Sequence, residues 1–319
     1  MHSLERTAVG RFSASDAYTL DRLRELDGPA REAALIPAED CLDFPALSLP
    51  PFQERLFRSG CEIYAADLPD FLPEDGALYK VRFALRKDTV EIYLDTSGDG
   101  LHKRGYRKNA TLAPIKETLA AAIADLGRVR RDSLVQDPFC GSGTLVIEAA
   151  QKALNLAPGL RRRFAAEHFD FVPADIWAEQ RQKALDEVRK DAAFEGIGYD
   201  IDPAAVALAN ANAKLAGVGD RCRFEVADVK EFRALDNATV LTNPPYGERL
   251  GDASEAASLA RTLGQVWQAH PAQGLYAITA DAEFEQHFGK KAARRRKIYN
   301  GMIPCQLYMY FEQPKRERK

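Results

Sequence analysis

The chain has 319 residues, a length that allows one large domain and a smaller one. Hydrophobic residues make up 46% of it and charged residues 29%, proportions typical of a soluble globular protein. The formal net charge of −3 excludes a global positive field, so any contact with nucleic acid must come from local basic patches.

The first part of the chain predicts a small α+β region. A charged helical pattern runs over residues 18–34, and the proline-rich stretch over residues 44–52 favours loop or edge structure, because proline lacks a backbone donor. Between residues 78 and 94, apolar and polar side chains alternate on either side of Arg86-Lys87-Asp88, which predicts a β-hairpin.

From Pro114 onwards, strand-like and helix-like segments alternate, which indicates a parallel, doubly wound α/β sheet. Near the end of the chain, Asn300-Gly301 separates two strand-like runs and is a strong hairpin signal, so we expect an antiparallel hairpin to close the sheet. The expected helices span about residues 115–126, 144–154, 202–217 and 254–269; the expected strands span residues 133–136, 196–199, 224–226, 238–242, 274–280, 297–299 and 303–311.

The first strand of this sheet leads into a loop with two glycines, Gly141 and Gly143, and then into a helix. Ligands of parallel sheets bind beyond the carboxyl ends of the strands, where glycines admit a ligand and the free N–H groups of the helix suit an anion. Val146 stands where a dinucleotide fingerprint has its third glycine, and no P-loop ending is present. A zwitterionic methionine fits better, with its carboxylate at the helix N-terminus and its ammonium paired with Asp137.

The second and third strands each end near an aspartate. Asp200 can accept both hydroxyls of a ribose, whereas Asp202 is expected to cap the next helix. Asp228 can accept a hydrogen bond from an adenine amino group. A cap or turn role remains open for Asp200 and for Asp228. The predicted cofactor-binding residues are Asp137, Phe139, Cys140, Gly141, Ser142, Gly143, Thr144, Asp200, Ile201, Asp228, Val229 and Asn243.

The fourth strand ends at Asn243-Pro244-Pro245-Tyr246, a rigid loop at the carboxyl edge of the sheet. An exocyclic base amine is a poor nucleophile, because its lone pair is delocalised into the ring. If the Asn243 side-chain oxygen and the Pro244 carbonyl accept its two N–H groups, the nitrogen is oriented towards a methyl donor. Tyr246 can stack on a base taken out of its helix. The alternative is a strand-ending turn with a core tyrosine. These four residues are the predicted catalytic set.

Two basic clusters flank this predicted site in the sequence-derived topology. They are predicted to contact RNA phosphates, although a charge run can also be simply a solvated face. The predicted RNA-binding residues are Lys103, Arg104, Tyr106, Arg107, Arg294, Arg295 and Arg296.

The five cysteines and five histidines are scattered, with no C-x-x-C pair. We therefore expect neither a metal site nor a disulfide framework. The first residues lack the pattern of a signal peptide, and no run is long enough to span a membrane, so a cytoplasmic location is expected.

Taken with stretches outside the catalytic loop, these motifs resemble the THUMP-associated, N-P-P-Y class of guanine-N2 RNA methyltransferases, and within it the bacterial enzymes that act on 23S ribosomal RNA. The resemblance implies a Rossmann-like methyltransferase domain with a mostly parallel seven-stranded sheet, S-adenosyl-L-methionine as cofactor, and guanine N2 of 23S rRNA or of an assembling large subunit as target. It is carried by residues 94–107, 113–120, 157–160, 243–250 and 297–301, with Cys305.

In that family a complete THUMP module usually precedes the catalytic domain, whereas about 75 residues precede the hairpin here. We therefore expect a partial THUMP-like, RNA-binding region with a linker over residues 1–108 and a catalytic domain over residues 109–319. Three alternatives remain open: guanine-N2 methylation of tRNA, adenine-N6 methylation, and a non-catalytic RNA-binding factor in ribosome assembly.

Overall fold

The computed structural model describes residues 9–13, 78–86, 89–107, 115–246 and 253–311. The helical pattern over residues 18–34, the proline-rich stretch over residues 44–52 and the carboxyl-terminal tail lie outside them. The chain divides into two compact units. The first comprises Met1–Gly100 and Arg163–Trp177, and the second comprises Leu101–Arg162 and Ala178–Lys319.

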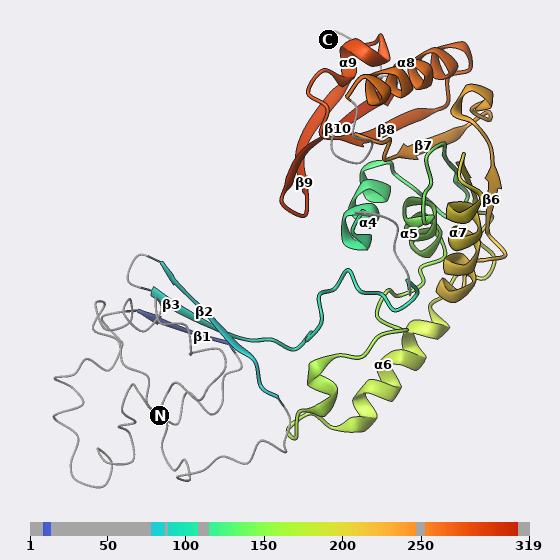
Figure 1. Ribbon diagram of the computed structural model, residues 1–319. Helices are drawn as coiled ribbons and strands as arrows, with labels where there is room; N and C mark the ends of the chain where they lie inside the picture. The colour runs from blue at the N-terminus through green and yellow to red at the C-terminus, as the bar shows by residue number, and fades with distance from the viewer. Residues whose placement is uncertain (1–8, 14–77, 87–88, 108–114, 247–252, 312–319) are drawn as a thin grey trace, which may run out of the picture. The chain divides into compact units, whose positions relative to one another are not determined.

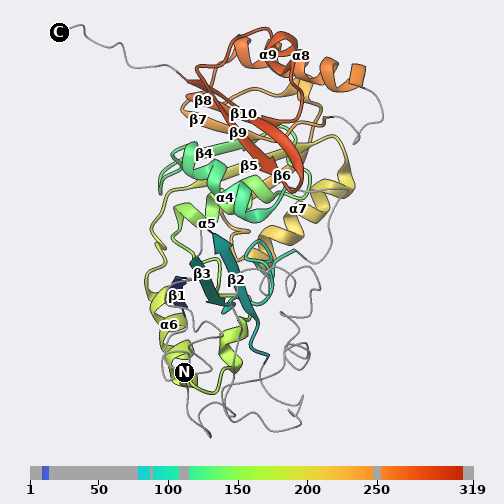
Figure 2. The same ribbon diagram turned by 90° about the vertical axis from the view of Figure 1, so that its left-hand side faces the viewer.

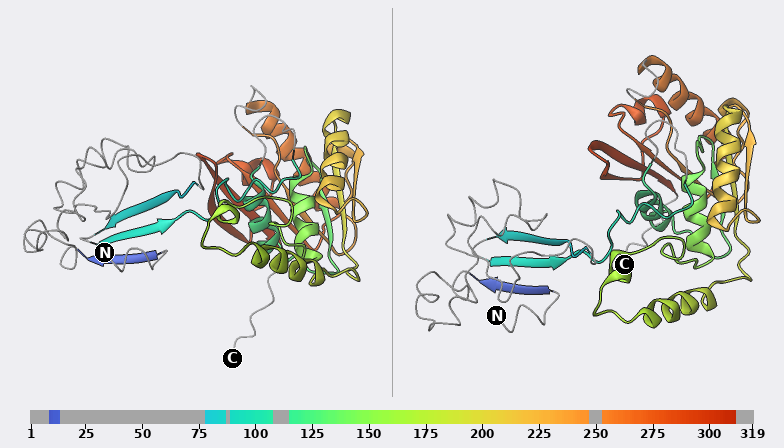
Figure 3. Two further views of the ribbon diagram at one scale, coloured as in Figure 1. Left: turned by 90° about the horizontal axis from the view of Figure 1, so that it is seen from below. Right: turned by 60° about the horizontal axis from the view of Figure 1, so that its bottom comes forward.

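The first unit contains a three-stranded antiparallel sheet in the order β1-β3-β2 (Figure 3, blue and cyan). Strands β2 (Val81–Arg86) and β3 (Thr89–Leu94) form the predicted hairpin, with Arg86 opposite Thr89. Strand β1 (Val9–Ser13) pairs along the other edge of β3 and was not predicted. The same unit includes the 3-10 helix η2 (Ala165–His168).

The second unit contains a seven-stranded sheet in the order β6-β5-β4-β7-β8-β10-β9 (Figure 1). Neighbours from β6 to β8 are parallel, and β10 is antiparallel to both β8 and β9, so the predicted closing hairpin is confirmed. The strands are β4 (Leu134–Asp137), β5 (Glu195–Asp200), β6 (Cys222–Val226), β7 (Ala238–Thr242), β8 (Gly274–Thr279), β9 (Arg294–Asn300) and β10 (Ile303–Phe311).

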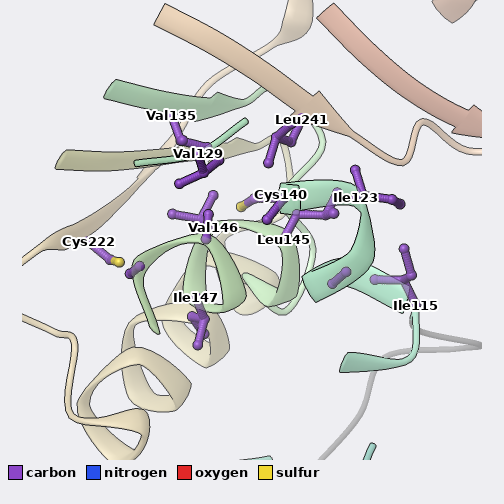
Figure 4. Close-up of a cluster of buried hydrophobic side chains, with 14 of the residues drawn as sticks. Ile115, Ile123, Val129, Val135, Cys140, Leu145, Val146, Ile147, Cys222 and Leu241 are labelled. Atoms are coloured by element: carbon purple, nitrogen blue, oxygen red, sulfur yellow. The ribbon is translucent and has the colours of Figure 1, made fainter. Parts of the chain in front are cut away.

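Helices cover both faces of this sheet (Figure 2). Side chains alternate between the faces along β8: Tyr276 and Ile278 join one buried cluster, whereas Leu275 and Ala277 join the other. The first cluster packs around α5, which is buried along almost its whole length (Figure 4). The helices are α4 (Glu117–Leu126), α5 (Thr144–Ala153), α6 (Ala174–Asp186), α7 (Pro203–Ala216), α8 (Ala253–Ala269) and α9 (Phe284–Phe288), with the 3-10 helix η3 (Val229–Glu231).

None of the helices in the described part of the chain is long and apolar enough to cross a membrane.

Because β4, β5, β6 and β7 are parallel, their carboxyl ends lie along one edge of the sheet. The residues that follow those four ends are the ones predicted from the sequence to form a site.

Candidate active site

The loop between β4 and α5 depends on two left-handed glycines. The φ angles of Gly141 and Gly143 are 51° and 82°. A Cβ on Gly143 would lie 2.8 Å from Phe224 Cζ, so Gly143 is required for packing as well as for its backbone conformation. A Cβ on Gly141 would meet nothing within 4 Å, so this side of the loop borders open space. Gly143 also begins α5 without a side-chain cap, which leaves the helix N-terminus suited to an anion.

Asp200 ties this loop to the end of β5. Its Oδ2 accepts a hydrogen bond from the Gly141 N–H at 2.9 Å, and its Oδ1 accepts one from the Asp202 N–H at 3.0 Å. Asp202 caps α7 by accepting the Ala204 N–H at 2.8 Å, as predicted. A carboxylate can accept further hydrogen bonds, so the ribose contact of Asp200 stays a prediction.

Asp137 lies at the end of β4 and is only 1% exposed. Its Oδ1 accepts hydrogen bonds from the Phe139 N–H at 3.0 Å and from the Thr242 hydroxyl at 2.8 Å. Burial raises the pKa of Asp137 to about 7, and the nearby charge of Asp200 adds to this effect. A cationic partner would favour the ionised form, which makes this carboxyl suited to an ammonium group.

The end of the third strand presents a cap, and the end of the second strand presents an exposed apolar side chain. Asp228 caps η3 by accepting the Lys230 N–H at 2.9 Å, so the structure shows its turn role, and its adenine contact stays a prediction. Ile201 is 68% exposed and follows directly after Asp200, where an apolar side chain could cover a flat ring. Among the described residues, no cluster of His, Cys, Asp and Glu side chains could hold a metal ion.

Asn243 is the first residue after β7. Its Oδ1 is buried and has no hydrogen-bond partner among the described residues. A buried carbonyl oxygen without a donor costs about 1–3 kcal/mol, so such an atom is ready to accept a hydrogen bond from a ligand. The amide therefore offers an acceptor at the edge where β4 and β5 present Asp137 and Asp200.

Tyr246 is only 4% exposed and belongs to the core cluster around α5. Its hydroxyl accepts a hydrogen bond from the Asn300 side-chain amide at 3.3 Å, and the Cys305 thiol lies 3.8 Å away. Stacking on a base would require the ring to leave this position, so that role stays a prediction. Asn300 was not predicted as a site residue. The usable signal was a polar side chain at the end of a strand, next to the Gly301 turn.

Comparison with known proteins decides the family. Residues 104–309 match the model of the "RMKL-like, methyltransferase domain" family. The matched residues contain the whole seven-stranded sheet except the last two residues of β10. The chain belongs to this family.

Two relatives and one solved structure illustrate the similarity. A Bacillus subtilis (strain 168) protein provisionally named as RNA methyltransferase YpsC is 40% identical over 251 residues, 78% of this chain and 65% of that protein. The ribosomal RNA large subunit methyltransferase K/L of Syntrophotalea carbinolica (strain DSM 2380 / NBRC 103641 / GraBd1) is 38% identical over 249 residues, 72% of this chain and 34% of that protein. The matched region is thus about two thirds of the first relative and about a third of the second. A similar solved structure is the crystal structure of SMU.472, provisionally named as a methyltransferase and complexed with SAH. The TM-score is 0.73 and the sequence identity 30%, and the match covers 96% of this chain and 83% of that chain.

These findings confirm the Rossmann-like fold and S-adenosylmethionine as the cofactor. The edge of the sheet fits that molecule, because Gly141 leaves open space beside an uncapped helix N-terminus and a buried carboxyl. Asp137 would hold the ammonium, the N–H groups at the start of α5 would hold the carboxylate, and Asp200 would hold the ribose.

Cofactor binding is expected to release a proton. With a pKa of about 7, Asp137 is partly protonated near neutral pH, and an ammonium beside it would lower that pKa. Affinity should therefore rise with pH up to about 7 and level off above it. Calorimetry in buffers of different ionisation enthalpy measures the released proton directly. Asp137→Asn should lose both the release and the pH dependence; an equal release from this variant would contradict the assignment. Burial also raises the pKa of Glu148 to about 7, so the variant is needed to separate the two groups.

In the first basic cluster, Tyr106 is buried, Arg104 and Arg107 are partly buried, and Lys103 is exposed. Tyr106 is 1% exposed and donates its hydroxyl to Glu148 Oε1 at 3.0 Å, while Arg104 Nη2 lies 3.5 Å from Glu148 Oε2. Arg107 pairs with Glu117 at 3.3 Å and donates to the Thr144 hydroxyl at 2.6 Å. Buried carboxylates require such partners, so these side chains stabilise α4 and α5. RNA contact by Arg104, Tyr106 and Arg107 stays a prediction.

Arg107→Ala is expected to lower the free energy of unfolding by about 3 kcal/mol, because it leaves Glu117 buried without its cation. Urea unfolding measures this loss. Lys103→Ala is the matched control, since Lys103 is exposed four residues earlier and should retain nearly full stability. If Arg107→Ala kept its stability but bound RNA more weakly, the predicted RNA contact would be right after all.

The second basic cluster remains at the surface. Arg294, Arg295 and Arg296 are all exposed on β9, the edge strand of the sheet. Arg295 is paired with both carboxylate oxygens of Glu285. RNA contact by this strand and by Lys103 stays a prediction.

Proposed function

We propose that this protein transfers a methyl group from S-adenosylmethionine to the exocyclic N2 of a guanine in 23S ribosomal RNA. The observation that carries the proposal is the buried, unpartnered Oδ1 of Asn243 at the carboxyl end of β7, an atom with no donor among the described residues. The names of the K/L relatives support the choice of ribosomal RNA.

The cofactor supplies an electrophilic methyl group when bound. The chain's own task is to orient a weak nucleophile. Asn243 Oδ1 and the Pro244 carbonyl accept the two N–H bonds of the guanine amine, which directs its lone pair towards the methyl group. The same acceptors stabilise the positive charge that develops on nitrogen before a proton leaves. This chemistry requires no strong base.

Mass spectrometry of nucleosides tests the proposal. Purified full chain and S-adenosylmethionine are incubated separately with unmodified 23S rRNA, tRNA and DNA. N2-methylguanosine in 23S rRNA alone is the expected result. N6-methyladenine, or a product confined to tRNA or DNA, would overturn the substrate while keeping the cofactor. If cofactor binds without any product on naked RNA or on assembling large subunits, the non-catalytic alternative is right.

A further inference from the structure

The end of the β9–β10 hairpin overhangs the edge of the sheet that carries the site. Strand β10 pairs with β8 only as far as Gln306, opposite Thr279, which is the last residue of β8. Its pairing with β9 continues to Ile303, opposite Asn300. Because β8 runs parallel to β7, residues 298–305 extend beyond the edge at which β7 ends and Asn243 follows (Figure 1).

This overhang is attached to the reaction loop. Asn300, the last residue of β9, is 7% exposed and donates its side-chain N–H to the Tyr246 hydroxyl at 3.3 Å. Ile298, on the same face of β9, packs against the core cluster that contains Tyr246. The hairpin end therefore has a fixed position beside the N-P-P-Y segment.

The same turn also presents large apolar side chains to solvent. Tyr299 is 57% exposed, Met302 is 94% exposed and Ile303 is 41% exposed; we call these three residues the hairpin tip. Gly301 between them has a φ of 67° and open space where a Cβ would lie. Large apolar side chains gathered at an exposed turn indicate a surface that is covered by a partner.

Charge identifies the class of partner. Strand β9 leads into the tip through exposed basic residues, in a chain with a net charge of −3. Lys297 lies on the same face of β9 as Tyr299, and Arg294 and Arg296 lie on the other face of this edge strand. The Lys297 ammonium lies 5.6 Å from the centre of the Tyr299 ring. Cations beside an aromatic ring and apolar side chains match a nucleic acid with unstacked bases, since the phosphates bind the cations and the bases stack on the ring.

We propose that the hairpin tip inserts into the RNA next to the target nucleotide and keeps it unstacked in front of Asn243, while Arg294 and Arg296 bind the adjoining phosphates. The proposal rests on the proposed function, since it assigns the strand separation that an amine-modifying enzyme needs. Apolar wedges perform the same physical task in proteins that kink duplexes.

Binding measured at several salt concentrations separates the contribution of the hairpin tip from that of the phosphate-binding arginines. Full-length variants are titrated against in vitro transcribed 23S rRNA at several salt concentrations. Tyr299→Ala/Met302→Ala should weaken binding about 5- to 150-fold at every salt concentration, because a stacked base contributes about 1–3 kcal/mol. Arg294→Ala/Arg296→Ala should instead reduce the salt slope, by about 0.7 for each phosphate that the variant no longer binds. Leu215→Ala and Arg261→Ala, on α7 and α8, are the apolar and basic controls and should match the wild type.

Unchanged affinity for S-adenosylhomocysteine and an unchanged melting temperature show that the variants are folded. Met302→Ser gives a second test, because a side chain that is 94% exposed cannot disrupt the core. Wild-type binding by the tip variants would overturn the inference even if N2-methylguanosine forms. Conversely, if the product is a different methylated nucleoside but the tip variants still lose affinity for that RNA, guanine specificity fails and the tip assignment stands. If the wild type binds neither this RNA nor an assembling large subunit, both proposals are wrong.

Discussion

Asn243→Ala is expected to lower the rate of methyl transfer about 100- to 1,000-fold, the usual effect of removing one preorganised group that stabilises developing charge. Its Oδ1 is buried without a partner in the described residues, and a small side chain there removes the acceptor without breaking a hydrogen bond of that oxygen to any of them. Because Asp137 and Asp200 remain in place, affinity for S-adenosylmethionine should be nearly unchanged. Single-turnover transfer and calorimetry measure the two effects separately.

The matched variant for this site is Asn243→Asp, which keeps an acceptor of nearly the same size and should retain more activity than alanine. An equal loss of activity in Asn243→Asp and Asn243→Ala would indicate that the residue acts by packing. Retained turnover in Asn243→Ala would remove the residue from its assigned role.

Asp200→Ala should weaken S-adenosylmethionine binding by at least about tenfold, since one charge-assisted hydrogen bond contributes about 1.5–3 kcal/mol. Two effects add. The variant loses the carboxylate that would accept the ribose hydroxyls, and it also releases the Gly141 N–H, which Asp200 Oδ2 accepts at 2.9 Å. The glycine loop should therefore be less well ordered before the cofactor arrives. Calorimetry with S-adenosylhomocysteine gives the affinity without turnover.

Asp202→Ala is the control for this prediction. Asp202 lies two residues further along but caps α7, so its loss should cost about 1 kcal/mol of stability and leave cofactor affinity nearly unchanged. If Asp202→Ala weakened binding and Asp200→Ala did not, the ribose contact would belong to Asp202.

The elements with strong local signals were predicted closely. The helix from Thr144, the cap at Asp202 and the strand over residues 238–242 all carry complete boundary or burial patterns, and the structure confirms them. Helix α6 was missed because none of its residues is buried, so it has no apolar periodicity to detect. Helix α9 has only five residues, too few for a helical period.

What the sequence left out at the site has a different cause. In a run such as 103–107 the sequence shows the cations but not the carboxylates that they pair with. Glu117 and Glu148 come from two separate helices, and only the fold brings their carboxylates to Arg107 and Arg104. The Asn300–Tyr246 contact likewise joins residues 54 positions apart, which no local pattern can reveal.

The internal arginines also bear on where a minimal catalytic fragment can begin. A fragment starting at residue 109, the boundary expected from the sequence, would lack Arg104, Tyr106 and Arg107 and would leave Glu117 and Glu148 buried without their partners. The second compact unit starts at Leu101 and retains all three. Arg104, Tyr106 and Arg107 thus belong to the packing of the catalytic part. We expect a shorter expression fragment to be unstable for electrostatic reasons, although every predicted cofactor-binding residue would be present.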